Sequence, residues 1–225
     1  MSSAERDLNG LKGEIVRAAE LVFESGVMQH SGHGNISARL AEDRMVLTGR
    51  GNIEGLTADD LAVVSFEGEV FEGSTDSSTA EIVAMHAGVY RAREQVGSII
   101  HTHSPHVAAF ALAHEPLPCA YEALLRFGVT GAIPVADWAP RGSEESVANI
   151  VEQVESHPDT LAVLLANHGL LAFHEDPIRT ARLIVAMEEA AETTLGARGI
   201  GGEKPFPAGA LERERERMAR FESSN

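Results

Sequence analysis

Apolar positions along the chain follow two spacings, one typical of helices and one of strands. Between residues 8 and 25, apolar residues recur every three to four positions, and Gly26 follows as a stop, so a helix is predicted there. These residues are Leu8, Leu11, Ile15, Ala18 and Val22. Similar spacing and capping signals predict helices over 81–93, 105–113, 144–155 and 177–195. Short apolar runs bounded by glycine or polar residues predict strands over 44–48, 61–66, 69–72, 96–102, 133–135, 161–165 and 170–173.

The order of these elements predicts one α/β domain. Strands arrive as runs and hairpins interspersed with helices, and no repeat or linker divides the middle of the chain. We therefore expect a three-layer α/β/α sandwich on a mainly antiparallel sheet over residues 1–200. Residues 201–225 are expected to form a charged C-terminal tail, because charges alternate along 211–221 as on a solvent-facing or partner-facing helix.

Two helix starts carry recognisable capping signals. The hydroxyl residues Ser77–Thr79 precede the helix predicted over 81–93 and are expected to cap it. Ser104 followed by Pro105 predicts an N-cap and first helical residue for the helix over 105–113.

Composition narrows the range of partners. The formal net charge of −16 disfavours binding to nucleic acid or to an anionic membrane surface. No apolar run approaches the roughly 18 residues of a membrane span, and the polar start shows no signal peptide. The one cysteine, Cys119, cannot form an internal disulfide. These features predict a cytoplasmic protein.

The sharpest chemical signal is a pair of histidines at the end of a predicted strand. Because side chains alternate along a strand, His101 and His103 share one face, while Thr102 points away. Two adjacent imidazoles are a platform for a metal, although a His-x-His pattern also arises by chance in a chain with ten histidines. His168, next to Gly169 at a predicted hairpin tip, is the best candidate for a third ligand.

Three histidine ligands leave one coordination position open, as in catalytic metal sites. Zinc is the first choice for imidazole ligands, with other divalent metals possible. Glu81 is a candidate general acid/base, or simply a first-turn glutamate favoured by the helix dipole. Among the remaining histidines, His86 is expected in the core and His106 beside the site. His30 and His33 could line a pocket, and the others, His114, His157 and His174, are expected at the surface.

Glycine and hydroxyl residues form a candidate anion site. Gly34-Asn35 and the stretch Thr48-Gly49-Arg50-Gly51 resemble loops whose backbone N–H groups bind phosphate, and Ser77-Ser78 lie at a helix N-terminus. Ordinary turns produce the same glycines, so either loop alone is weak evidence.

Together, these motifs resemble the class II aldolase/adducin family. The resemblance rests on Gly34-Asn-Ile-Ser-Ala-Arg39, Thr48-Gly49, Ser77-Ser78 with Glu81, His101-Thr-His103 and His168-Gly169, which occur in that order. It implies an α/β/α sandwich, a small phosphorylated sugar as substrate, and a homotetramer with active sites at subunit interfaces. It also implies His101, His103 and His168 as metal ligands, Glu81 as acid/base, and a phosphate site at Gly34, Asn35, Thr48, Gly49, Ser77 and Ser78.

The chain departs from the family pattern at two places. Thr79-Ala80 separate Ser77-Ser78 from Glu81, whereas the family's aldolases have glutamate directly after the serines. The tail lacks the proton-donating tyrosine of those aldolases, and Tyr121 is the nearest counterpart.

Three functions follow as hypotheses. The first is a metal-dependent lyase that cleaves a ketose 1-phosphate into dihydroxyacetone phosphate and an aldehyde. The second is a decarboxylase or dehydratase on the same scaffold, with Arg50 or His33 holding a carboxylate. The third is a non-enzymatic binding module. No nucleotide-binding motif occurs, so no organic cofactor is expected.

Overall fold

An eight-stranded sheet forms the centre of the computed structural model, which describes residues 7–28 and 32–222. Within these residues the strand order is β4-β3-β2-β1-β5-β8-β7-β6. Neighbouring strands are antiparallel except β6 and β7, which are parallel. The strands are β1 (Asn35–Arg39), β2 (Arg44–Thr48), β3 (Leu61–Ser65), β4 (Val70–Glu72), β5 (Ser98–Thr102), β6 (Val135–Ala136), β7 (Ala162–Leu165) and β8 (Gly169–His174).

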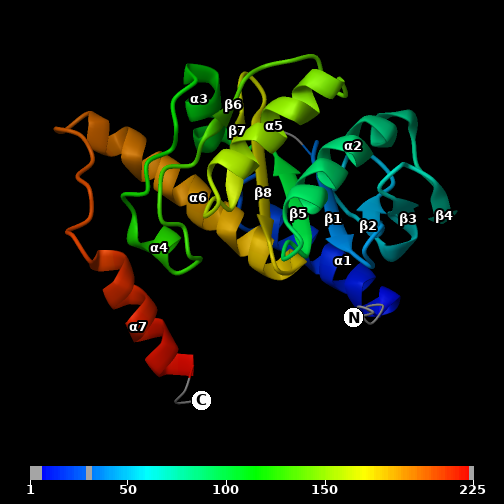
Figure 1. Cartoon of the computed structure of the whole chain (residues 1–225), viewed down its shortest axis with the longest axis horizontal. Coiled ribbons are helices and arrows are strands. Elements are labelled where there is room, and N and C mark those ends of the chain that lie inside the picture. Colours follow the sequence, from blue (N-terminus) through cyan, green and yellow to red (C-terminus); the bar gives the residue numbers. More distant parts are fainter. Residues whose placement is uncertain (1–6, 29–31, 223–225) are drawn as a thin grey trace.

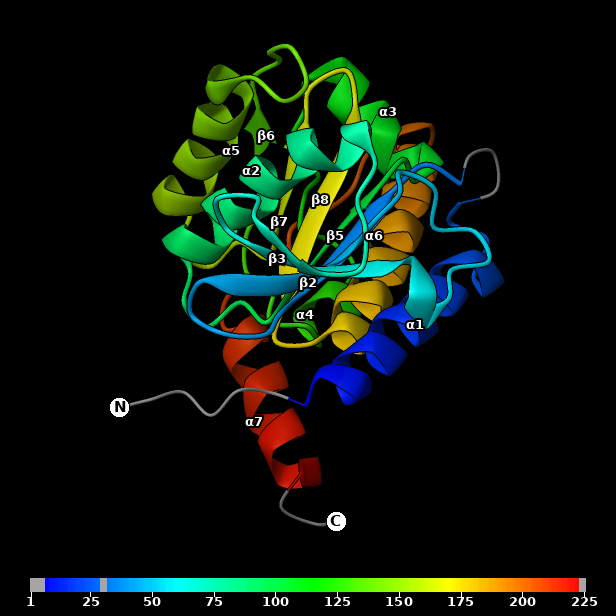
Figure 2. The ribbon, with the colours of Figure 1, turned by 90° about the vertical axis from the view of Figure 1, so that its right-hand side faces the viewer.

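Helices cover both faces of this sheet, as Figures 1 and 2 show. One face packs against α1 (Leu8–Glu24), α3 (Pro105–Ala113), α4 (Glu122–Leu125) and α6 (Pro177–Arg198). The other packs against α2 (Ser77–Ala92) and α5 (Glu144–Ser156). A short 3-10 helix (Ala58–Asp60) precedes β3, and α7 (Ala210–Glu222) extends away from the sheet (Figure 1). This arrangement confirms the predicted α/β/α sandwich on a mainly antiparallel sheet.

Alternation along the central strands separates the two cores. In β5, Ile99 packs toward α2 and α5, while Ile100 packs toward α1 and α6. In β8, Leu171 packs toward α2 and α5, and Leu170 packs toward α1 and α6. Since His101 lies two residues after Ile99, its ring lies on the face covered by α2 and α5.

Most predicted elements are confirmed within a few residues, but the start of α2 differs. The helix begins at Ser77, and its N-cap is Asp76 rather than any of Ser77–Thr79. The Asp76 carboxylate accepts the N–H groups of Ser78 and Thr79 at 2.9 and 3.1 Å. A carboxylate one residue upstream satisfies these donors, so the predicted cap residues become the first helical turn instead. Strand β6 also lies slightly later than predicted.

The start of α3 is held by a residue from another helix. Ser104 and Pro105 occupy the predicted N-cap and first helical position, but the Ser104 hydroxyl pairs with Thr102 Oγ1 at 2.9 Å instead of capping the helix. Glu188 of α6 accepts the N–H groups of His106 and Val107 at 2.9 and 3.0 Å. Because Glu188 is only 8% exposed, α3 and α6 share a buried, charge-assisted cap close to His103.

No helix in the described part of the chain combines the length and apolar character that a membrane crossing requires.

Candidate active site

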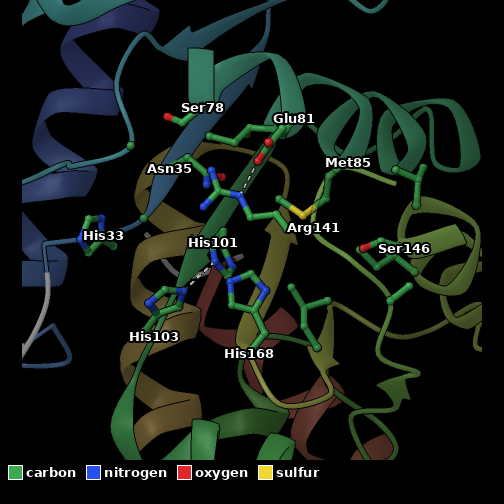
Figure 3. A pocket seen from close by; sticks show the side chains of 18 of the residues that line it. His33, Asn35, Ser78, Glu81, Met85, His101, His103, Arg141, Ser146 and His168 are labelled. Atoms are coloured by element: carbon green, nitrogen blue, oxygen red, sulfur yellow. Dashed lines mark hydrogen bonds and ion pairs between the residues drawn. The ribbon is translucent and has the colours of Figure 1, made fainter. Parts of the chain in front are cut away.

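Three imidazole rings converge at the end of the central strands (Figure 3). His101 is in β5, His103 follows it, and His168 lies in the turn between β7 and β8. One nitrogen from each ring lies within 4.8 Å of the others, and the two Nε2 atoms of His101 and His103 are 3.1 Å apart. The structure therefore brings together the three histidines that the sequence nominated as metal ligands.

Local backbone geometry explains this convergence. Thr102 of β5 pairs with Leu170 of β8, which places the β7–β8 turn beside the end of β5. In that turn Asn167 adopts a left-handed backbone conformation (φ 57°), and its N–H donates to the Ala111 carbonyl at 3.1 Å. Gly169 allows the close approach, because a Cβ there would lie 2.5 Å from the Thr102 carbonyl oxygen and 2.9 Å from His103 Cδ2.

The protonation states suit metal binding. His101 Nδ1 donates to the Leu170 carbonyl at 2.8 Å, which leaves the Nε2 lone pair facing the other rings. Burial, with the neighbouring imidazoles, holds the pKa of His101 well below its ordinary value. Burial likewise lowers the pKa of His103, and it lowers that of His168 to about 4. Neutral rings with converging lone pairs fit a divalent metal.

The histidines open into a cavity of about 790 Å³. Glu81 of α2 points into it, five residues into the helix, and its carboxylate pairs with Arg141 Nε at 2.8 Å (Figure 3). Apolar side chains line the same cavity, among them Ile82 and Met85 of α2 and Val147 of α5. The metal position and the predicted acid/base thus share one cavity.

Arg141 is a cavity residue that the sequence analysis missed. It belongs to the loop 137–143 between β6 and α5, and its positive charge contributes to the lowered pKa of both His103 and His168. Gly142, with φ 77°, follows it, and a Cβ there would lie 2.8 Å from Glu81 Cγ. The one sequence signal was this Arg-Gly pair immediately before a helix start.

The predicted phosphate residues divide into two groups. Gly34, Asn35 and Ser78 line the cavity. The others, Thr48, Gly49 and Ser77, are absent from its described lining. Thr48 is fully buried and its hydroxyl oxygen accepts the Ile36 N–H at 3.3 Å, whereas the Gly49 N–H donates to the Asp60 carbonyl at 2.8 Å.

Within the described residues, only the second half of the predicted glycine stretch 48–51 lines the cavity. Arg50, Gly51 and Asn52 line it, and Gly51 is so close to α2 that a Cβ would lie 3.2 Å from the Ser78 hydroxyl oxygen. Arg50 Nε pairs with Asp60 Oδ1 at 3.1 Å, so much of its charge is neutralised within the loop.

Asn35 is oriented by a buried chain of hydrogen bonds. His86 Nε2 lies 2.6 Å from Asn35 Oδ1, and His86 Nδ1 lies 2.7 Å from Ser37 Oγ. Ser37 Oγ in turn lies 2.8 Å from the Tyr90 hydroxyl. Desolvation lowers the pKa of His86 to about 3, so the ring is neutral. With Asn35 Oδ1 engaged, the amide N–H groups remain for the cavity.

Other candidate residues lie at various distances from the cavity. His33 lines it, whereas His30 lies outside the described residues. The Tyr121 hydroxyl donates to Glu189 at 2.8 Å, and His106 Nδ1 pairs with Glu188 at 2.8 Å; neither belongs to the described lining. His86 is in the core as predicted, and His174 is half-buried rather than on the surface.

Comparisons with known proteins agree with this fold. The Class II Aldolase and Adducin N-terminal domain family matches residues 13–195. A 5-deoxy-D-ribulose 1-phosphate aldolase from Bacillus thuringiensis serovar kurstaki is 30% identical over 201 residues, covering 88% of this chain and 91% of the relative. A 3-oxo-tetronate 4-phosphate decarboxylase from Cupriavidus necator is 25% identical, covering 89% of this chain and 92% of the relative. A solved L-fuculose 1-phosphate aldolase superposes with a TM-score of 0.81 at 25% identity, covering 96% of this chain and 99% of its own.

The fold and the three-histidine cavity define a metal-dependent lyase of the class II aldolase type. The chain belongs to the class II aldolase and adducin family.

Proposed function

We propose that this enzyme cleaves a ketose 1-phosphate into dihydroxyacetone phosphate and an aldehyde. The observation that carries the proposal is the shared cavity, in which three neutral imidazoles, the Glu81 carboxylate and the polar groups of Asn35 and Ser78 meet. Relatives named as sugar-phosphate aldolases support the same reaction class.

In the proposed reaction the C3–C4 bond of the ketose breaks and its electron pair stays on C3. The C4 hydroxyl loses a proton as the aldehyde forms, and C3 gains one. Glu81, the carboxylate that points into the cavity, moves the proton at C3. A divalent metal held by His101, His103 and His168 would polarise the substrate carbonyl and stabilise the negative charge that cleavage develops.

We place the substrate phosphate against Gly51, Ser78 and Asn35. The Ser78 and Thr79 N–H groups and the Ser78 hydroxyl all donate to Asp76 in this structure, so a phosphate at the N-terminus of α2 would take these donors over from that carboxylate. Anchoring the phosphate there would position the ketone toward the histidines, and such positioning is a large part of catalysis.

The remaining parts of the proposal concern the metal, the assembly and the tail. Zinc is the metal that best suits three imidazoles. We also propose a cytoplasmic homotetramer with active sites at subunit interfaces, in which residues 1–200 form the catalytic domain and 201–225 a charged tail. Light scattering coupled to gel filtration tests the oligomer.

Decarboxylation of a phosphorylated oxo acid is a second candidate. It is favoured by Arg141, a cation in the cavity next to Glu81 and close enough to influence His103 and His168. A relative named as an oxo acid phosphate decarboxylase supports it. Release of CO₂ rather than an aldehyde would identify this reaction.

The test combines metal content with product analysis. Elemental mass spectrometry of the protein purified without chelators should find about one metal per chain, lost in His101→Ala. Incubation with a panel of ketose 1-phosphates should then release dihydroxyacetone phosphate, and Glu81→Gln should keep the metal but lose turnover. Full turnover by Glu81→Gln would remove the assigned role of Glu81. The absence of metal in protein supplied with zinc would overturn the lyase proposal.

A further inference from the structure

The strongest unassigned feature of the cavity is the ion pair between Arg141 and Glu81. Both side chains are about half exposed, with fractions of 56% and 47%, so solvent screens the pair and it contributes little to folding stability. Within residues 7–28 and 32–222, no other residue forms a hydrogen bond or ion pair with the Arg141 guanidinium. The guanidinium therefore keeps donors for a further anion.

Hydrogen bonds and a glycine fix the backbone of the loop that carries Arg141. The Ser143 N–H donates to the Pro140 carbonyl at 3.0 Å, and Asn149 Nδ2 of α5 donates to the Asp137 carbonyl at 3.1 Å. Gly142 then takes up a left-handed conformation where a Cβ would collide with Glu81. These two hydrogen bonds and the glycine at position 142 hold the loop against the cavity. An ion pair exposed to solvent does not require a loop fixed in this way.

Location separates Arg141 from the other arginine of the described lining. Arg50 pairs with Asp60 through Nε and also donates to the carbonyls of Glu54 and Gly55, so its guanidinium supports its own loop. The Arg141 side chain lies between Glu81 and the histidines (Figure 3), and its charge contributes to the lowered pKa of His103 and His168. An anion on Arg141 would therefore lie near the reacting atoms, whereas a phosphate at Gly51 and Ser78 lies at the first turn of α2.

The group that Arg141 contacts in this structure indicates that its ligand is a carboxylate. A guanidinium is planar and matches the two oxygens of a carboxylate, and the group that Arg141 contacts in this structure is the carboxylate of Glu81. Resting on the function proposed above, we propose that Arg141 determines specificity: it binds a carboxylate on the part of the substrate remote from the phosphate. As the substrate takes this place, Glu81 loses its partner and becomes available for proton transfer.

Binding measurements on the zinc-loaded protein test this with two probes. 4-Phosphoerythronate carries a phosphate and a carboxylate at opposite ends of a four-carbon chain, whereas erythritol 4-phosphate has the same chain and phosphate but a hydroxymethyl group in place of the carboxylate. Isothermal titration compares wild type with Arg141→Met, which keeps a side chain of similar bulk but removes its charge. The matched control is Arg91→Met, since Arg91 forms an exposed ion pair with Glu67 outside the cavity lining.

We expect Arg141→Met to weaken 4-phosphoerythronate binding at least tenfold and erythritol 4-phosphate binding less than twofold. Arg91→Met should change neither. Glu81→Gln removes the carboxylate that competes for Arg141 within the protein, so it should strengthen 4-phosphoerythronate binding relative to erythritol 4-phosphate binding. A purely structural role of Arg141 would not produce this opposite pair of effects.

The outcomes separate the two proposals. If erythritol 4-phosphate binds and Arg141→Met leaves 4-phosphoerythronate binding unchanged, the carboxylate assignment is overturned while the phosphate site stands. Equal weakening of both probes would assign Arg141 to the phosphate instead. If wild type binds neither probe, the phosphate site of the proposed function fails, and the specificity proposal that rests on it fails too.

Discussion

Replacing Gly169 with alanine tests whether the close contact between the β7–β8 turn and β5 holds the three histidines together. The added Cβ would lie 2.5 Å from the Thr102 carbonyl oxygen, about 0.9 Å closer than the 3.4 Å at which ordinary contact starts. The same methyl group would lie 2.9 Å from His103 Cδ2 and 3.4 Å from His101 Cε1. Because Thr102 pairs with Leu170 in the centre of the sheet, the backbone cannot yield without separating β5 from β8.

Two effects should follow, each with its own size. Overpacking of this kind costs about 1–3 kcal/mol, which for a chain of this length lowers the melting temperature by about 2–12 °C. Displacement of the two ligand rings should weaken zinc binding about 10- to 100-fold, as for other changes that misplace ligands. Circular dichroism melting of the metal-free protein and competition titration with a zinc chelator measure the two effects separately.

Gly131→Ala is the matched control, since no atom would lie within 4 Å of the added methyl group and the φ of Gly131 is not positive. It should leave both quantities unchanged. If Gly169→Ala melts and binds zinc like wild type, the close approach does not organise the site.

Three further predictions concern the surroundings of the site. His86→Phe should remove part of the acid sensitivity of folding. The pKa of this histidine is about 3 when folded against 6.5 as its ordinary value, so unfolding is favoured by about 1.4 kcal/mol for each pH unit below 6.5 down to about 3. Urea unfolding at pH 7 and pH 5 should thus show a smaller difference for the variant than for wild type. Glu188→Ala should lose about 2–4 kcal/mol of unfolding free energy, because it leaves buried α3 donors without an acceptor, and an unchanged urea midpoint would contradict the cap. Asn35→Asp should raise the inhibition constant of inorganic phosphate at least tenfold by placing a carboxylate at the anion site; equal inhibition of both proteins would move the phosphate elsewhere.

Periodicity predicted the parts of the fold that are decided by burial. The alternation at Ile99 and Ile100 is a direct consequence of a strand buried on both faces, and the same alternation placed His101 and His103 on one side. His168 could be proposed as the third metal ligand because it lies at a predicted hairpin tip next to a glycine. In the structure Gly169 allows this tip to approach β5 closely. These inferences depend on local geometry, which the sequence carries.

Features that depend on contacts between distant segments could not be predicted. The close packing at Gly49 is one example, because a Cβ there would collide with the carbonyl oxygen of Ser74, 25 residues further along the chain. The cap of α3 comes from Glu188, more than 80 residues further along the chain. Arg141 enters the cavity only because α5 packs beside α2, and no spacing in the sequence encodes that neighbourhood.

The position of β6 in the sheet has a consequence for how this enzyme can be altered. β6 is a two-residue strand at the edge of the sheet, and the segment 137–142 that follows it carries Arg141, whereas the histidines lie on and between the central strands. Sequence changes in 137–142 therefore leave the strands that carry the metal ligands intact. A library randomised over this segment, with Gly142 retained, would change which substrates bind while the metal ligands stay the same. Directed evolution of new lyases should therefore begin with this segment.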